Sequence, residues 1–169
     1  RDKDRTRMTC AVIDNLRAHI KNAKPYFICV SDRSRNGHDK VIQEHLERIG
    51  ETEFSVLRTF PEYGRYGWGA AINIGLSEAF KKVEGSTCAL VVDNDWLLQK
   101  DLDIDKYLYA FAFSTIGAIT FKPVHGGTNV TMTDLKLADG SEYLLRAKGA
   151  QQRYSFTAEI GCMLISKNM

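Results

Sequence analysis

Apolar residues recur every three to four positions near the start of the chain, which is the period of an amphipathic helix. The pattern runs from residue 6 to residue 23 through Met8, Ala11, Val12, Leu16 and Ile20. Pro25 predicts its end, because a proline disfavours helical backbone at the residue before it. The residues YFICV at 26–30 are apolar and precede the turn-forming SDRSRNG, so we expect a buried strand there. Helix and strand together make the first half of an α/β unit.

The same alternation continues through the middle of the chain. We expect a second helix over 39–49, ended by Gly50, and a second strand over 54–60. A glycine-rich segment leads into a third helix over 68–82, and TCALVVDND at 87–95 predicts a third strand. Strands that alternate with helices indicate a mostly parallel sheet with helices on both faces.

The last third of the chain is richer in strand patterns. We expect a strand within 116–123, a hairpin over 128–146 with its turn at Asp139–Gly140, and an apolar strand over 159–167. The predicted fold class is therefore α/β, with a mostly parallel, Rossmann-like sheet flanked by helices and a β-rich C-terminal portion.

Length and composition predict one domain over residues 1–169. A chain of 169 residues that is 44% hydrophobic can bury one sizeable core but is short for two ordinary domains. Both ends look cut, because the chain opens with the charged run RDKDRTR and stops just after an apolar run, so we expect a fragment of a longer protein. The net charge of +2 gives no indication of a nucleic-acid or membrane-surface partner, so an anionic ligand must be held locally.

The cysteines indicate a reducing environment. The chain has 4 of them, far apart and without C-x-x-C spacing, which disfavours a zinc site or a redox motif: Cys10, Cys29, Cys88 and Cys162. No segment resembles a signal peptide, and no apolar stretch approaches the roughly 20 residues that span a bilayer. We therefore expect a cytoplasmic location and no membrane segment in this chain.

Two acids follow the apolar run of the third predicted strand. Asp93 and Asp95 have no lysine or arginine within three positions on either side. Their mutual repulsion favours a hard divalent cation such as Mg²⁺ or Mn²⁺, which completes its coordination with water and substrate phosphates. The alternative is that both acids are turn and cap residues that lead into the segment 96–100.

Other polar groups follow the preceding predicted strands, where ligands of open α/β sheets bind. Asp32 follows the strand at 26–30 and suits a base N–H or a ribose hydroxyl, unless it only forms an Asx turn. Arg65 lies among glycines before the helix that begins near Trp68, whose free N–H groups suit an anion. Arg65 would then hold a phosphate, and the alternative is a solvated loop arginine.

The order of these segments resembles the GT-A glycosyltransferases, in particular the large family-two group of inverting sugar transferases. The matching stretches are VSDRS at 30–34, GRYGWGAAINIG at 64–75 and VVDNDW at 91–96. The resemblance implies a GT-A fold, a nucleotide-diphosphate sugar as donor and a metal-dependent transfer to an acceptor hydroxyl. It also implies that Asp32 contacts the base, that Asp93 contacts the ribose or a metal-bound water, and that Asp95 binds the Mn²⁺ or Mg²⁺ ion.

Three further side chains are candidates for the same site. Glu159 is the best candidate for the general base that an inverting transferase needs, and the alternative is a surface acid at a strand edge. His125, in the loop PVHGG, would reach a phosphate or the metal, unless it is only exposed. Trp96 would stack on a sugar or base, unless it only packs beside the strand end.

Two other functions remain open from the sequence. A nucleotidyltransferase uses a similar sheet with metal-binding aspartates to join a sugar phosphate to a nucleotide. A non-catalytic domain that binds a nucleotide sugar or a glycan needs no general base. The acceptor of the predicted transferase, whether glycan, lipid or protein, is not indicated by any motif.

Overall fold

The computed structural model describes most of the first two thirds of the chain and several strands of the last third: residues 2–32, 37–59, 68–112, 118–121, 133–136, 142–145 and 162–167. The chain divides into two compact units. Unit 1 comprises Arg1–Ser86 and Leu97–Leu102, and unit 2 comprises Thr87–Trp96 and Asp103–Met169. The expectation of a single domain stays a prediction.

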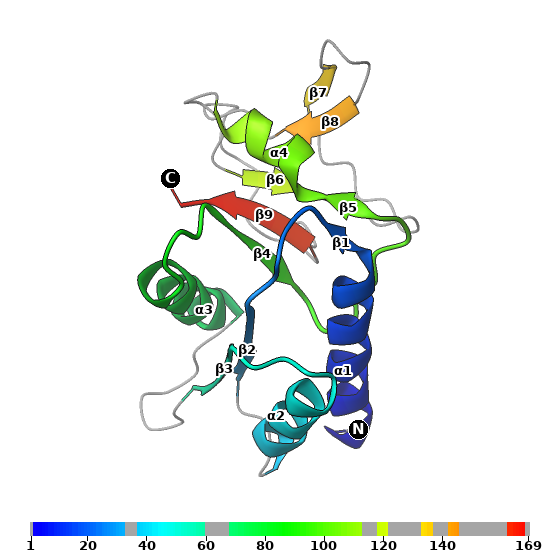
Figure 1. Ribbon diagram of the computed structural model, residues 1–169, viewed down its shortest axis with the longest axis vertical. Coiled ribbons are helices and arrows are strands. Elements are labelled where there is room, and N and C mark those ends of the chain that lie inside the picture. The colour runs from blue at the N-terminus through cyan, green and yellow to red at the C-terminus, as the bar shows by residue number, and fades with distance from the viewer. Residues whose placement is uncertain are drawn as a thin grey trace. The chain divides into compact units, whose positions relative to one another are not determined.

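Unit 1 is built around a parallel pair of strands. β2 (Phe27–Ser31) and β3 (Phe54–Arg58) pair from Phe27 opposite Phe54 to Ser31 opposite Arg58. The crossover between them contains α2 (His38–Arg48), and α1 (Asp2–His19) precedes them in the chain. The strand–helix–strand unit expected from the sequence is therefore confirmed (Figure 1).

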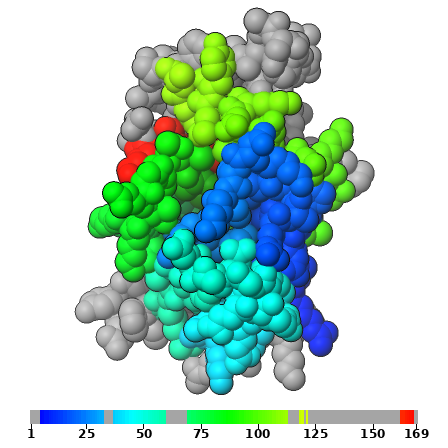
Figure 2. All heavy atoms as spheres, viewed as in Figure 1, coloured from blue at the N-terminus to red at the C-terminus, as the bar shows by residue number. Residues whose placement is uncertain are grey.

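Helices cover both faces of this strand pair. On one face, α1 and α2 adjoin (Figure 2) and enclose a cluster of buried side chains, Ile13, Phe27, Ile42 and Leu46, which Cys29 also joins. On the other face lies α3 (Trp68–Lys82), where a Cβ atom added to Gly75 would be 3.2 Å from Val30 Cγ2. Successive strand residues point to opposite faces, so Cys29 and Val30 contact different helices.

The end of α2 follows the sequence prediction for Gly50. Its φ of 87° is left-handed, and its N–H donates to the Glu47 carbonyl at 3.0 Å. The Glu51 N–H donates to the Leu46 carbonyl at 3.0 Å. This pair of bonds is the Schellman motif, which satisfies carbonyls that the end of a helix leaves free.

Unit 2 contains a five-stranded antiparallel sheet in the order β4-β9-β6-β8-β7. Its strands are β4 (Cys88–Val92), β6 (Ala118–Thr120), β7 (Thr133–Lys136), β8 (Glu142–Leu145) and β9 (Cys162–Ser166). The antiparallel pairing of β7 with β8 confirms the predicted hairpin, whose turn at Asp139–Gly140 lies outside the described residues. The pairing of β4 with β9 joins segments distant in sequence, and the local pattern did not predict it.

The sequence analysis missed one helix of unit 2, α4 (Ile104–Phe111). Its signal was the spacing of Ile104, Tyr107, Leu108 and Phe111 after Asp103, which occupies the N-cap position. The Tyr107 ring meets the Phe121 ring edge to face, with their centroids 5.3 Å apart. It also missed two short strands, β1 (Ile20–Lys21) and β5 (Leu102–Asp103), which form a sheet of their own.

The fold class is mixed α/β, as the sequence predicted, but the predicted mostly parallel, Rossmann-like sheet is not confirmed. β4, which was expected to be its third strand, pairs antiparallel with β9. Parallel pairing occurs between β2 and β3, and the sheet of unit 2 is antiparallel. None of the helices in the described ranges combines the length and the apolar character that crossing a bilayer requires.

Candidate functional site

The carboxyl end of the β2–β3 pair holds the Asp32 side chain in place. Thr59 Oγ1 donates a hydrogen bond to Asp32 Oδ1 at 2.7 Å, and the Thr59 N–H donates to the Ser31 carbonyl at 3.1 Å. Thr59 is 3% exposed and Asp32 is half-buried. The parallel register produces this contact, because Ser31 lies opposite Arg58, the residue before Thr59. A carboxylate fixed at this edge is suited to accept hydrogen bonds from a ligand.

The residue before Asp32 carries a buried hydroxyl. Ser31 is 7% exposed, and among the described residues its Oγ has no hydrogen-bond partner. A buried polar atom left unpaired costs about 1–3 kcal/mol, so such atoms are few in folded proteins.

The acids of the D-x-D segment form a turn immediately after β4. The Trp96 N–H donates to the Asp93 carbonyl at 3.2 Å, which closes the turn over residues 93–96. Asp93 and Trp96 are half-buried, whereas Asp95 is exposed. The prediction that these acids follow the end of an apolar strand is confirmed.

Asp93 also acts on a buried thiol of the same sheet. Asp93 follows Val92, which lies opposite Cys162 in the β4–β9 pair. Burial raises the pKa of the Cys162 thiol to about 12, and the negative charge of Asp93 contributes to that shift. The Asp93 carboxylate therefore lies close enough to the end of the sheet for its charge to reach the buried strand β9.

A metal at this turn would have few protein ligands. Within the described ranges, no group of three or more His, Cys, Asp and Glu side chains is arranged to hold a metal ion. Asp93 and Asp95 would supply two carboxylates at most from this turn. That number suits Mg²⁺ or Mn²⁺, because such ions complete their coordination with water and substrate phosphates.

The predicted site residues fall into three groups. Asp32 belongs to unit 1, and Asp93, Asp95 and Trp96 belong to unit 2. The structure thus describes two parts of the predicted site separately, and their closeness stays a prediction. The remaining candidates lie outside the described residues: Arg65, His125 and Glu159.

The start of α3 agrees with the sequence prediction. α3 begins at Trp68, and a Cβ atom added to Gly69 would have no neighbour within 4 Å. Gly69 is exposed, and a side chain there would meet no described residue.

One contact that the sequence analysis missed anchors the chain after the acidic turn. Asn15 Nδ2 donates to the Leu98 carbonyl at 3.1 Å, and the Leu98 N–H donates to Asn15 Oδ1 at 2.6 Å. His19 Nδ1 lies 3.0 Å from Asp101 Oδ1, further along the same segment. The only sequence signal was an asparagine between the apolar positions 12 and 16 of α1.

The histidines of α2 have structural partners at the α1–α2 contact. His45 is buried, and Arg48 Nη2 lies 2.7 Å from its Nδ1. A guanidinium has only donors, so Nδ1 accepts this bond and Nε2 carries the proton that His45 donates to Asp14 at 2.8 Å. His38 Nδ1 is hydrogen-bonded to Thr6. These contacts explain both residues without a ligand.

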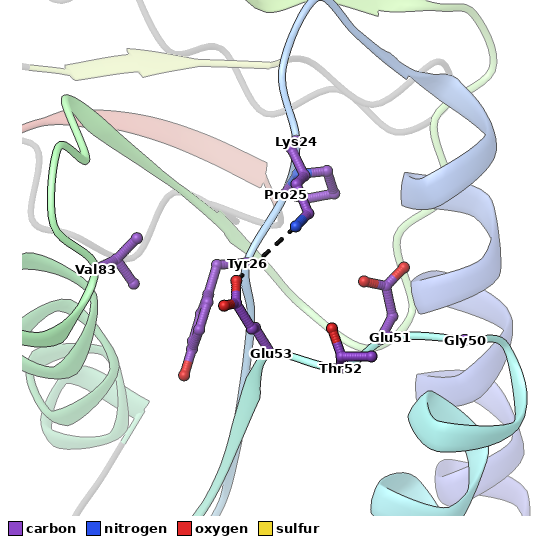
Figure 3. A pocket seen from close by; sticks show the side chains of 8 residues that line it. All are labelled: Lys24, Pro25, Tyr26, Gly50, Glu51, Thr52, Glu53 and Val83. Carbon is purple, nitrogen blue, oxygen red and sulfur yellow. Dashed lines mark ion pairs between the residues drawn. The ribbon is translucent and has the colours of Figure 1, made fainter.

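Unit 1 also has a pocket of about 280 Å³ at the amino-terminal ends of β2 and β3 (Figure 3). It is lined by Lys24, Pro25, Tyr26, Gly50, Glu51, Thr52, Glu53 and Val83. Lys24 Nζ and Glu53 Oε2 are 3.9 Å apart, and their side chains are 81% and 71% exposed, so this ion pair contributes little stability. The pocket lies at the opposite end of the strands from Asp32, away from the edge where open α/β sheets bind ligands.

Comparison with known proteins gave no match. No protein-family model matches the chain, and no curated protein or solved structure matches it. A functional proposal therefore rests on the residues at the ends of β2, β3 and β4 and on their geometry.

Proposed function

We propose that the chain is a metal-dependent glycosyltransferase that moves a sugar from a nucleotide-diphosphate sugar to an acceptor hydroxyl. The observation that supports this most is the carboxyl end of the parallel β2–β3 pair, where the Thr59 hydroxyl holds the Asp32 carboxylate. The order of the three segments that resemble GT-A transferases gives the second support. The proposed arrangement is a Rossmann-like GT-A fold that brings the ends of β2 and β4 to one donor site.

The proposed roles follow from the chemistry of each side chain. Asp32 Oδ1 accepts a hydrogen bond from Thr59, so Oδ2 is the oxygen that would accept a bond from the base or ribose of the nucleotide. Asp93 and Asp95 would hold Mn²⁺ or Mg²⁺ against the diphosphate. The N-terminus of α3 and Arg65 would bind phosphate oxygens.

Sugar transfer needs charge stabilisation at the leaving group and a base at the acceptor. A bound divalent ion supplies the first, as a Lewis acid that stabilises negative charge on the departing diphosphate. Glu159 would take the proton of the acceptor hydroxyl, Trp96 would form a wall against the sugar, and His125 would assist at the phosphate or metal. Asp32 would orient the nucleotide without taking part in proton transfer.

We also propose that the protein works in the cytoplasm. The support comes from its thiols, because all four cysteines are free. Burial raises the pKa of Cys29 and of Cys162 to about 12, which keeps both thiols protonated and unreactive at neutral pH.

A thermal-shift screen of nucleoside diphosphates with and without Mn²⁺ tests the proposed function. We expect one nucleotide family to raise the melting temperature only when metal is present, because a ligand at 100 times its Kd stabilises by about 2.7 kcal/mol. Asp95→Ala should abolish the shift. The matched control Asn94→Ala, which changes an exposed neutral residue of the same turn, should keep it.

Three outcomes would count against the proposal in different ways. A shift that needs no metal, or that survives Asp95→Ala, would contradict the metal site. Binding of nucleotide sugars without any release of nucleoside diphosphate would indicate a non-catalytic binding domain. Consumption of a sugar phosphate and a nucleoside triphosphate would indicate a nucleotidyltransferase.

A further inference from the structure

The segment that follows the acidic turn is fixed to α1 at two places. Asn15 forms two hydrogen bonds with the backbone of Leu98, of 3.1 Å and 2.6 Å. Asp101 Oδ1 lies 3.0 Å from His19 Nδ1 and 3.8 Å from Lys21 Nζ. All of these residues belong to unit 1, to which Leu97–Leu102 returns after the turn. The segment is thus bound along the C-terminal half of α1.

Asn15 is the strongest of these anchors because it satisfies both polar groups of one residue. A primary amide offers a donor and an acceptor side by side, and here they meet the carbonyl and the N–H of Leu98. Asn15 is half-buried, so losing its side chain would leave two partly buried backbone groups without these partners. His19 and Lys21 both contact the Asp101 carboxylate, whose side chain is 60% exposed. These exposed ion pairs contribute less to the position of the segment than the Asn15 hydrogen bonds.

The anchor lies very close in the chain to the proposed metal ligands. Asp95 and Leu98 are three residues apart, so their Cα atoms cannot be separated by more than roughly 11 Å, whatever the arrangement of the two units. The hydrogen bond from the Trp96 N–H to the Asp93 carbonyl closes the turn, and Leu97 alone separates that bond from Leu98. The Leu98 anchor is therefore separated from the end of the turn by one residue of the chain.

We propose that Asn15 is the positioning residue of the acidic turn 93–96. By fixing Leu98, it reduces the freedom of the backbone that carries Asp93 and Asp95. This lowers the cost of ordering the two carboxylates around a cation. The identity of the cation, Mn²⁺ or Mg²⁺, rests on the proposed function, whereas the ordering of the turn by Asn15 does not.

Amide hydrogen exchange tests the ordering directly. Asn15→Leu, which removes both bonds and keeps a side chain branched at Cγ, should accelerate exchange at Leu98 and also at Trp96 by at least fivefold. Asn15→Asp, which keeps an acceptor for the Leu98 N–H, should give intermediate rates and serves if the leucine variant does not fold. Ile13→Val is the matched control, because it loosens the buried face of the same helix and leaves Leu98 untouched. It should change neither rate relative to the rest of unit 1.

Mn²⁺ binding, followed by the loss of the free-ion electron paramagnetic resonance signal, tests the consequence. Asn15→Leu should weaken binding by at least threefold at a temperature well below its unfolding transition, and Ile13→Val should leave binding unchanged. Faster exchange at Leu98 without a change at Trp96, or equal weakening by both variants, would overturn the proposal. If the unmodified protein bound no Mn²⁺, the proposed function would fail, and exchange at Trp96 would still decide whether Asn15 orders the turn.

Discussion

At the residue scale, the hydrogen bond between Thr59 and Asp32 sets the geometry of the proposed nucleotide contact. Thr59 is almost completely buried, and its hydroxyl meets one carboxylate oxygen at 2.7 Å. The bond limits rotation of the carboxylate, so a ligand would meet an oxygen whose direction is already set. Fixing the carboxylate in advance reduces the conformational entropy that the Asp32 side chain must lose when a ligand binds.

Thr59→Val should reveal this role, because valine keeps the shape and removes the hydroxyl. We expect the free energy of unfolding to fall by about 1.5 kcal/mol, the contribution of a hydrogen bond to a charged group. Urea denaturation measures this change. The nucleotide-dependent thermal shift should also become smaller, whereas Thr59→Ser, which keeps the hydroxyl, should preserve it. Equal loss of the nucleotide effect in both variants would show that packing of the methyl group, and not the hydrogen bond, is responsible.

At the element scale, helix ends and lengths depend on local rules that the sequence expresses well. α3 covers the predicted 68–82. α2 ends at Arg48, and the left-handed Gly50 that follows completes the Schellman bonds, as its predicted role in ending the helix requires. α4 was missed because its 8 residues give only about two turns of pattern in a segment that lacks a strong start signal other than Asp103. Short helices depend more on packing than on local pattern.

Gly50→Ala tests the element-scale argument. An alanine at a φ of 87° should lower the free energy of unfolding by about 1–2 kcal/mol, because the left-handed region is unfavourable for a residue with a Cβ atom. Gly69→Ala in α3 should have the opposite effect, because the added Cβ would meet no neighbour and alanine favours a helix over glycine. It should raise the free energy of unfolding by about 0.5 kcal/mol. Thermal or urea unfolding of the pair should give shifts of opposite sign, and shifts of the same sign would contradict this account.

At the scale of the whole molecule, the sequence predicted local units better than their assembly. The parallel β2–β3 pair and the β7–β8 hairpin follow from periodicity and turn residues within short segments. The β4–β9 pair and the Asn15–Leu98 contact join residues 70 or more positions apart, and no local pattern encodes them. The sequence therefore identified Asp32 and Asp93 as acids at strand ends. It did not indicate their partners, such as the Thr59 hydroxyl that donates to Asp32.

The buried thiols predict how the stability of both units depends on pH. Burial raises the pKa of Cys29 in unit 1 and of Cys162 in unit 2 from 9.0 to about 12. Below pH 9 each thiol is protonated in both the folded and the unfolded chain. Between pH 9 and 12 only the unfolded chain releases these protons, so stability should fall as the pH rises through this window.

Urea titrations from pH 8 to 11 measure this dependence. Cys29→Ala and Cys162→Ala should each reduce the slope of stability against pH above pH 9, although both lower the stability at pH 8 by leaving a small cavity. Cys88→Ala gives a third comparison, because burial also raises the pKa of that half-buried thiol. If the slope of stability against pH stayed unchanged in both Cys29→Ala and Cys162→Ala, the loss of stability at alkaline pH would come from groups other than these thiols.

The division of the chain between the units limits how the protein can be dissected. Unit 1 is discontinuous in sequence. It comprises residues up to Ser86 and the separate segment Leu97–Leu102, and the chain belongs to unit 2 again from Asp103. A fragment that ends at Ser86 would contain α1 but would lack Leu98, so the Asn15 amide would lose both of its backbone hydrogen-bond partners. A fragment that preserves unit 1 must therefore also contain the six residues Leu97–Leu102, for example joined to Ser86 by a flexible glycine-serine linker.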